Sequence, residues 1–177
     1  MLPPLVEKAL ALAERAGFDR SCSPETGLLL RVLAAQRGRL RVAEIGTGCG
    51  VGSAWLLSGL GPEVAFLTVE LDPARAAAVA ELLEADENAR VLPGDWREVL
   101  VAEAPFDLLF ADGGRAKEHE ELVGLLAPGG TLVVDNLTPG RGRSDSVRRL
   151  WLEHPRLVGV ELLVSEREAV VVGTLEA

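Results

Sequence analysis

Three glycines at alternate positions follow a short apolar run and have the spacing of a ligand-binding turn. They are Gly46, Gly48 and Gly50, in the segment VAEIGTGCG (42–50). Glycine lets the chain turn tightly and lets a ligand approach the backbone closely. A helix that starts after such a turn offers free N–H groups and its positive end to an anion. Glycines also occur simply as turn residues, so the loop predicts a binding site only together with its neighbours.

An acidic residue, Glu70, ends the next apolar run, 24 positions beyond Gly46. In dinucleotide-binding folds, an acid about 20 residues past the glycine loop accepts the hydroxyls of a ribose. Here the spacing is Gly-x-Gly-x-Gly with Glu44 two positions ahead, and it differs from the Gly-x-Gly-x-x-Gly of those folds. Either acid near Pro73 could merely cap the helix that this proline opens. Asp72 fits that cap well, which leaves Glu70 free for a ligand.

The third apolar run ends in the segment PGDW (93–96), at the edge where open α/β sheets bind ligands. Asp95 could accept a hydrogen bond from the exocyclic amine of an adenine, and Trp96 could offer it a flat apolar face. Equally, Asp95 could be only a helix cap and Trp96 only a core residue. Both interpretations stay open.

The elements that carry these residues can be read from the spacing of apolar side chains. Two helical patterns come first: one stops at Gly17, and the other runs from the cap residue Ser23 to Gly38. Apolar runs over 40–45, 64–69, 89–92, 106–111 and 131–134 then alternate with helical segments over 53–60, 73–85, 96–101 and 117–126. Runs without polar alternation indicate strands covered on both faces, as in parallel sheets.

The last part of the chain changes this rhythm. A helix is expected over 144–153, and strands over 157–164 and 169–175 are separated by four residues, which is hairpin spacing. The sequence therefore predicts an α/β fold: a Rossmann-like, doubly wound, seven-stranded sheet, mostly parallel with an antiparallel C-terminal strand and helices on both faces. We expect one domain over 1–177, with N-terminal helices (1–38) covering the site, a core (39–136) and a C-terminal helix and hairpin (137–177).

Composition narrows the possible partners. The net charge of −9 and the pI of about 4.8 repel phosphate backbones, which argues against a nucleic-acid partner. The arginines at 141, 143, 148 and 149 are typical of a solvated face. Cys22 and Cys49 lack metal-ligand spacing and favour a reducing cytoplasm. No apolar stretch reaches the roughly 18 residues of a membrane span, so a membrane partner is not expected.

Four motifs together resemble, in order, those of class I S-adenosylmethionine-dependent methyltransferases. They are the glycine loop with its preceding acid, VELD (69–72), Gly94-Asp95 and LAPGGT (126–131), and they cover the chain from about 40 to 136. The C-terminal hairpin resembles that fold's final strand pair. The resemblance implies S-adenosylmethionine as cofactor and a small-molecule substrate. The cofactor-binding residues it implies are Glu44, Gly46, Thr47, Gly48, Gly50, Ser53, Glu70, Leu71, Gly94, Asp95, Trp96 and Asp112.

Within that superfamily the chain looks most like the small metal-dependent O-methyltransferases of the catechol and caffeoyl-CoA type. The segments SPETGLL (23–29) and FDLLFAD (106–112) and the pair Asp135-Asn136 carry this likeness. It implies a catechol-like acceptor and a divalent ion, Mg²⁺ by preference, held by Asp112, Asp135 and Asn136. Two carboxylates and an amide oxygen are hard donors that suit Mg²⁺. Asp and Asn at strand ends are also common turn formers.

The chain departs from that family pattern at the catalytic positions. The likeness assigns catalytic roles to Asp112, Arg115 and Lys117, but Arg115 stands where the family has a lysine base, and arginine is a poor proton acceptor. The metal alone could activate the acceptor, or Arg115 could orient it electrostatically. Gly52 stands at the family's serine position, with Ser53 displaced by one.

Two other functions stay open. The first is a metal-independent methyltransferase in which Arg115 and the arginines of 141–149 grip an acidic substrate. The second is a non-catalytic module that keeps the cofactor pocket as a scaffold. A homodimer is also compatible with the sequence. The only two histidines, His119 and His154, lie in charged helical patterns and are expected on the surface, and Cys49 is expected to be a small buried residue.

Overall fold

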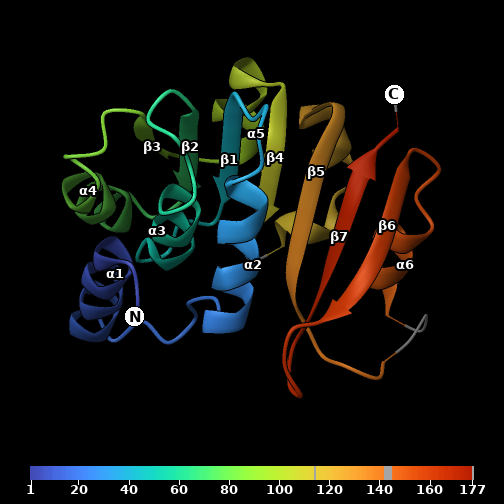
Figure 1. Ribbon diagram of the computed structural model, residues 1–177, viewed down its shortest axis with the longest axis horizontal. Coiled ribbons are helices and arrows are strands. Elements are labelled where there is room, and N and C mark those ends of the chain that lie inside the picture. The colour runs from blue at the N-terminus through green and yellow to red at the C-terminus, as the bar shows by residue number, and fades with distance from the viewer. Residues whose placement is uncertain (114, 142–144, 177) are drawn as a thin grey trace.

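The computed structural model describes residues 1–113, 115–141 and 145–176 and has a seven-stranded sheet at its centre, in the order β3-β2-β1-β4-β5-β7-β6 (Figure 1). β1 to β5 are parallel, whereas β7 runs antiparallel to both β5 and β6. The expected doubly wound sheet with an antiparallel C-terminal strand is confirmed. The strands are β1 Arg41–Ile45, β2 Ala65–Glu70, β3 Ala89–Pro93, β4 Phe106–Ala111, β5 Leu126–Leu137, β6 Leu157–Leu163 and β7 Ala169–Leu175.

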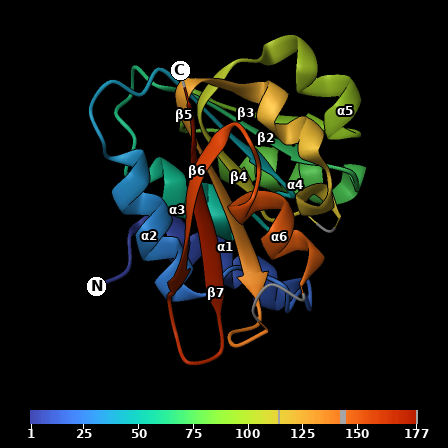
Figure 2. The ribbon, with the colours of Figure 1, turned by 90° about the vertical axis from the view of Figure 1, so that its right-hand side faces the viewer.

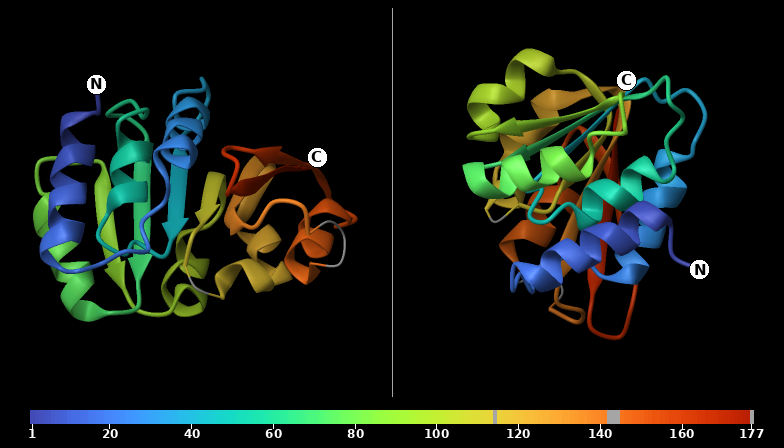
Figure 3. Two further views of the ribbon diagram at one scale, coloured as in Figure 1. Left: turned by 90° about the horizontal axis from the view of Figure 1, so that it is seen from below. Right: turned by 90° about the vertical axis from the view of Figure 1, so that its left-hand side faces the viewer.

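Helices cover both faces of the sheet, and each face has its own apolar cluster (Figure 3). The clusters arise because successive residues of a strand point to opposite faces. Val42 and Phe66 face the layer of α1 (Pro4–Arg15), α2 (Pro24–Ala34) and α3 (Val51–Leu57), which α4 (Pro73–Leu82) joins through Val79. Ala43 and Leu67 face α5 (Trp96–Val99), the short 3₁₀ segments and α6 (Ser146–Leu152).

Two helix starts follow the sequence signals directly. Ser23 Oγ accepts a hydrogen bond from the N–H of Thr26 at 3.1 Å, ahead of a proline in the first turn of α2. Asp72 Oδ1 accepts from the N–H groups of Ala74 and Arg75 at the start of α4. Both side chains satisfy N–H groups that a helix start leaves without partners. The expected caps of these two helices are therefore confirmed.

The segment expected as a crossover helix over 117–126 is not an α-helix, and this prediction is wrong. It forms two 3₁₀ segments, η2 (Ala116–Glu118) and η3 (Glu120–Leu125), after which β5 begins at once. Gly124 weakens α-helical propensity, and the short segment spans more distance per residue in the tighter 3₁₀ form. Leu122 and Leu125 are nonetheless buried against the sheet, as an apolar crossover requires.

Other boundaries shift by a few residues. α3 begins at Val51 rather than 53, with Gly50 as its N-cap, and the 3₁₀ turn η1 (Val101–Glu103) follows α5. β5 is longer than the expected 131–134, and β3 is an exposed edge strand rather than a fully covered one. Arg143 and Ser144, which the sequence placed in a basic run and at a helix start, lie outside the described residues.

The last two strands of the chain lie close to α2, near the beginning of the chain (Figure 2). The β6–β7 hairpin has α6 on one side and α2 on the other (Figure 2). None of the helices in the described ranges is both long and apolar enough to cross a membrane.

Candidate active site

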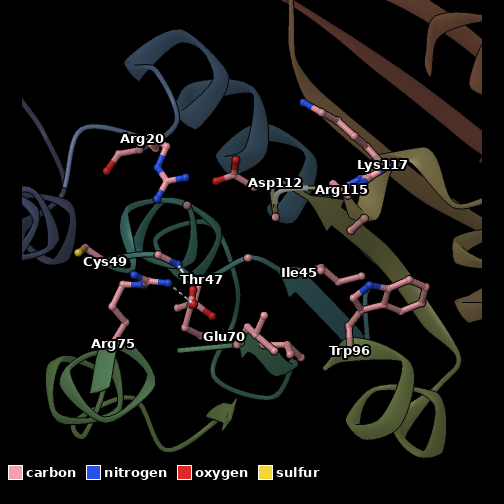
Figure 4. A pocket seen from close by; sticks show the side chains of 18 of the residues that line it. Arg20, Ile45, Thr47, Cys49, Glu70, Arg75, Trp96, Asp112, Arg115 and Lys117 are labelled. Atoms are coloured by element: carbon pink, nitrogen blue, oxygen red, sulfur yellow. Dashed lines mark hydrogen bonds and ion pairs between the residues drawn. The ribbon is translucent and has the colours of Figure 1, made fainter. Parts of the chain in front are cut away.

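A cavity of about 770 Å³ lies at the carboxyl ends of β1, β2 and β4 (Figure 4). This edge, where β1 has β2 on one side and β4 on the other, is the switch point at which open α/β sheets bind ligands. The candidate residues that line it are Gly46, Thr47, Gly48, Glu70, Leu71, Gly94, Asp95, Trp96, Asp112, Arg115, Lys117 and Asn136. Four other candidates, Glu44, Gly50, Ser53 and Asp135, lie outside its lining.

The glycine loop has the backbone geometry that its residue types suggest. Gly46, Gly48 and Gly50 all have positive φ angles of 95°, 53° and 81°, which favour glycine. A Cβ on Gly46 would lie 2.1 Å from the Cα of Gly113, because the segments that follow the parallel strands β1 and β4 pass close to each other there. The N–H groups of Gly46 and Thr47 both donate to the carbonyl of Val69, which fixes the loop on β2.

Glu70 faces the glycine loop, as expected, but it is not free. It is 5% exposed, and its Oε2 accepts from the N–H of Gly48 at 2.8 Å. Its Oε1 accepts from the N–H of Asp72 at 3.0 Å and from Nη2 of Arg75 at 2.9 Å. The prediction of a free carboxylate is therefore corrected. Arg75 was missed because nothing in its spacing distinguishes it from an ordinary helix residue.

Glu44 lies beneath the loop rather than in the cavity. It is fully buried, and its Oε2 accepts from the hydroxyls of Ser53 and Thr68. Burial raises the pKa of Glu44 to about 7, although both hydroxyl bonds oppose the rise. A Cβ on Gly52 would lie 2.2 Å from Glu44 Oε1, which shows how closely α3 passes. Glu44 and Ser53 thus join β1, β2 and α3, and they support the loop from below.

Asp112, Asp135 and Asn136 are brought together, as the sequence predicts. Asn136 Nδ2 donates to Asp112 Oδ1 at 3.4 Å and to Asp135 Oδ2 at 3.3 Å. Asn136 is also the only residue other than glycine with a positive φ, 56°, in the described part of the chain, a conformation that stores strain and gathers at functional sites. Asp135 is fully buried, and its Oδ1 has no hydrogen-bond partner.

Asp112 and Asp135 form an acidic pair whose negative charges are unfavourable without a cation. Burial is the main cause that raises the pKa of both carboxyls; Glu44 adds to it for Asp112, and Asp112 adds to it for Asp135. Such pKa values indicate that the carboxylate charges are poorly compensated. In both cases the positive charge of Lys117 acts in the opposite direction.

The donor set fits a hard divalent ion. Within the described ranges, no group of three His, Cys, Asp or Glu side chains could hold a metal ion. The donor set instead consists of the carboxylates of Asp112 and Asp135 and the amide of Asn136. Rotating the side-chain amide of Asn136 by 180° exchanges the positions of its nitrogen and oxygen, so that the oxygen can face an ion. Three such oxygens leave the remaining positions of Mg²⁺ to water and substrate. The unpartnered Oδ1 of Asp135 supports the same conclusion.

The two candidate cations differ in position. Lys117 is half-buried, and its Nζ donates to the backbone carbonyl of Asp135 at 3.0 Å. The Arg115 side chain is 85% exposed and pairs with Glu118 at 3.2 Å. Lys117 is therefore the cation beside the acidic pair, whereas Arg115 lies at the rim.

Asp95 and Trp96, whose roles the sequence left open, both line the cavity and also serve the fold. Asp95 Oδ1 accepts from the N–H of Arg97 as a helix cap, and Trp96 is 8% exposed, yet both line the cavity. His119, expected on the surface, is half-buried in the lining, with its Nε2 2.7 Å from Nη2 of Arg97. Cys49 is buried, as expected.

The loop between α1 and α2 supplies a wall that sequence reasoning missed, namely Phe18, Asp19, Arg20 and Ser21. Phe18 packs directly on the glycine loop, since a Cβ on Gly48 would lie 2.9 Å from its ring. Ser21 Oγ is buried without a hydrogen-bond partner. Only a phenylalanine in a polar loop hinted at this contact.

Two kinds of sequence comparison give the same family. A profile described as a methyltransferase domain matches residues 43–137. A putative O-methyltransferase of Mycobacteroides abscessus is 36% identical over 148 residues, 77% of this chain and 69% of that protein. A putative O-methyltransferase of Mycolicibacterium vanbaalenii is 35% identical over 136 residues, and the match spans 72% of this chain but only 60% of that relative.

Solved structures share the fold over nearly the whole chain. The O-methyltransferase TomG of Streptomyces achromogenes, in complex with SAM, has a TM-score of 0.81 and 22% identity, and the match covers 100% of this chain and 92% of that one. Cofactor-bound Rv0187 from MTB has a TM-score of 0.80 and 26% identity, and the match covers 99% of this chain and 92% of that one. A putative caffeoyl-CoA O-methyltransferase from Staphylococcus aureus has a TM-score of 0.75 and 17% identity over 96% and 91%.

Proposed function

Since the chain belongs to the S-adenosylmethionine-dependent methyltransferases of the methyltransferase domain family, we propose that it methylates a hydroxyl oxygen of a small molecule. The observation that carries this proposal is a single cavity lined by the glycine loop, Glu70, Asp112 and Asn136. The names of the mycobacterial relatives support oxygen as the acceptor atom.

The cofactor end of the cavity offers groups for each part of a nucleoside. Glu70 lies where a carboxylate accepts ribose hydroxyls, and Trp96 gives an apolar wall near Asp95 for the base. S-adenosylmethionine supplies an electrophilic methyl group on a positively charged sulfur. Gly46 and Gly48 line the same cavity, and their missing side chains leave room for the backbone of Gly113 and for the Phe18 ring.

Asp112 and Asn136 line the same cavity, and the buried Asp135 lies next to Asn136. Asp112, Asp135 and Asn136 would hold a divalent ion, which lowers the pKa of a bound hydroxyl and orients its oxygen. Lys117 adds a fixed positive charge beside the pair, where it stabilises a negatively charged acceptor oxygen. A catechol-like acceptor, with two adjacent hydroxyls, suits such an ion.

Calorimetry tests the proposal in two steps. S-adenosylhomocysteine is titrated into the protein with and without MgCl₂, and MgCl₂ is titrated into wild type, Asp112→Asn and Asp135→Asn. We expect nucleoside binding in all three proteins and Mg²⁺ binding in wild type alone. Absence of S-adenosylhomocysteine binding at millimolar concentration would remove the proposed function altogether, while absence of Mg²⁺ binding would remove only the metal.

A metal-independent reaction on an acidic substrate is the second candidate. It is favoured by the exposed Arg115 at the rim of the cavity. A chelator added to an active methyl-transfer assay separates the two, because undiminished turnover would support this second version. If a broad screen of catechol-like and acidic acceptors gave no methylated product despite cofactor binding, a non-catalytic binding module would remain.

A further inference from the structure

The hydrogen-bond capacity of Glu70 is nearly exhausted by the protein itself. A carboxylate has about four acceptor positions, two on each oxygen. On Oε1 the N–H of Asp72 and Nη2 of Arg75 use both positions, and on Oε2 the N–H of Gly48 uses one. A ribose presents two adjacent hydroxyl donors. Glu70 can therefore accept both only if one of its present donors leaves.

Arg75 is the donor that can leave at least cost. The two backbone N–H groups are fixed by the glycine loop and the start of α4, whereas the Arg75 side chain is 35% exposed and flexible. Its Nε is buried without a hydrogen-bond partner, so its present position is imperfectly satisfied. When the guanidinium of Arg75 moves away from Glu70, it can still bind water and Asp72, whose Oδ2 lies 3.4 Å from Arg75 Nη1.

Arg75 also lies against the wall that covers the loop. Its guanidinium carbon is 5.7 Å from the centroid of the Phe18 ring, and that of Arg20 is 5.4 Å from the same centroid. Phe18 in turn packs on Gly48, whose N–H bonds Glu70. Arg75, Glu70 and Phe18 therefore close one end of the cavity together, as Figure 4 shows for Arg75 and Glu70.

We propose that Arg75 is a positioning residue that occupies the Glu70 carboxylate and must yield it to the ribose hydroxyls when the nucleoside binds. This inference rests on the proposed function. The exchange breaks the ion pair between Arg75 Nη2 and Glu70 Oε1 and replaces it with a hydrogen bond from a ribose hydroxyl. Arg75 thereby lowers nucleoside affinity, and its removal raises that affinity.

The test compares the affinity of S-adenosylhomocysteine for wild type, Arg75→Gln, Glu70→Gln and the double variant. A partly exposed ion pair is worth up to about 1 kcal/mol, so Arg75→Gln should bind about 3- to 5-fold more tightly. In the Glu70→Gln background the same change should alter the affinity by less than about 1.5-fold, because the two residues act through one contact. This ligand lacks the sulfonium charge of S-adenosylmethionine, so repulsion between that charge and Arg75 cannot cause the gain.

Two controls separate this role from a structural one. Arg90→Gln removes an arginine from an exposed ion pair with Glu103, outside the lining of the cavity, so it should leave the affinity within about 1.5-fold of wild type. Arg75→Lys keeps a cation near Glu70 and should bind more weakly than Arg75→Gln. Raising the salt concentration should narrow the gap between wild type and Arg75→Gln, because salt weakens the ion pair.

The outcomes are distinguishable from those of the proposed function. If wild type does not bind S-adenosylhomocysteine, the proposed function fails. If wild type binds but Arg75→Gln binds equally or more weakly, Arg75 does not compete and this inference alone is overturned. A gain that persists in the Glu70→Gln background would also overturn it, because the effect would then not pass through Glu70.

Discussion

At the scale of single residues, the buried carboxyls of Glu44, Glu70 and Asp135 differ in their hydrogen-bond partners. Glu44 accepts from two hydroxyls on neighbouring elements and holds them together. Glu70 accepts from backbone N–H groups and orders the glycine loop. Asp135 and Glu44 are both fully buried, and each has one oxygen without a hydrogen-bond partner. An unsatisfied buried oxygen is costly, and the ion proposed for Asp112 and Asp135 would supply a partner for the Asp135 oxygen.

The pKa of Glu44 predicts a distinctive dependence of stability on pH. Because burial raises the pKa from 4.5 to about 7, the folded protein binds more protons than the unfolded chain between these pH values. Stability therefore falls as the pH rises through this range, by roughly 3 kcal/mol for the 2.5-unit difference. Glu44→Gln cannot ionise, so it lacks this loss of stability. The free energy of unfolding of Glu44→Gln should therefore rise relative to that of wild type between pH 4.5 and pH 7.5.

Urea unfolding at a series of pH values measures this difference. The exposed Glu166→Gln is the matched control, and its difference from wild type should be nearly constant. A Glu44→Gln difference that is equally flat would mean that the pKa of Glu44 is the same in the folded and the unfolded chain and that its hydroxyl partners fully offset the effect of burial.

The positions of Lys117 and Arg115 predict unequal effects of their replacement. Lys117→Met removes the cation beside the acidic pair and should lower kcat/KM about 100-fold in a methyl-transfer assay with a catechol acceptor. Arg115→Met changes an exposed side chain and should lower it less than about 3-fold. Affinity for S-adenosylhomocysteine should stay within about 3-fold in both. The reverse order of effects would place the catalytic cation at Arg115.

At the scale of elements, the close approach of the segments that follow β1 and β4 predicts that Gly46 cannot be replaced. Gly46→Ala combines a positive φ with a Cβ 2.1 Å from the backbone of Gly113, so it should destabilise the protein by about 3 kcal/mol or more. Gly38→Ala is the matched control: its φ is 88°, but a Cβ there meets nothing within 4 Å, and it should cost about 1 kcal/mol. Equal losses in chemical denaturation would show that the backbone shifts to relieve the contact.

Much of the architecture and of the cofactor site could be predicted because it depends on local patterns. Apolar runs marked β1, β2 and β4, and the caps at Ser23 and Asp72 marked two helix starts. Parallel strands end at one edge, so residues at their carboxyl ends had to come together. That reasoning placed Glu70 opposite the glycine loop and Asp112 near Asn136.

The remaining features depend on tertiary contacts that no periodicity records. Phe18 reaches Gly48 from an irregular loop, and the Arg75–Glu70 pair depends on how α4 leaves β2. Glu44 belonged to the right motif, but the motif could not tell a buried support from a cavity wall. The 3₁₀ segments before β5 likewise depend on the distance that the few residues between β4 and β5 must span.

At the scale of the whole molecule, the first and last parts of the chain meet close enough to Asp112 and Asp135 to affect their pKa values. Thr26 on α2 is fully buried, and its hydroxyl donates to Glu168 Oε1 at 2.9 Å, where Glu168 closes the β6–β7 hairpin. The negative charge of Glu168 also contributes to the raised pKa of Asp112 and of Asp135. The hairpin therefore acts on the site as well as on the fold.

This link predicts coupling between residues 142 positions apart in sequence. Thr26→Val keeps the side-chain shape but removes the donor, so it should lower the free energy of unfolding by about 1–2 kcal/mol. The exposed Thr174→Val should change it by less than about 0.5 kcal/mol. In a double-mutant cycle with Glu168→Ala, which removes the acceptor, a coupling energy of about 1 kcal/mol is expected. Strictly additive losses would mean that the hairpin is held by its strand pairing alone and that Thr26 does not bind it to α2.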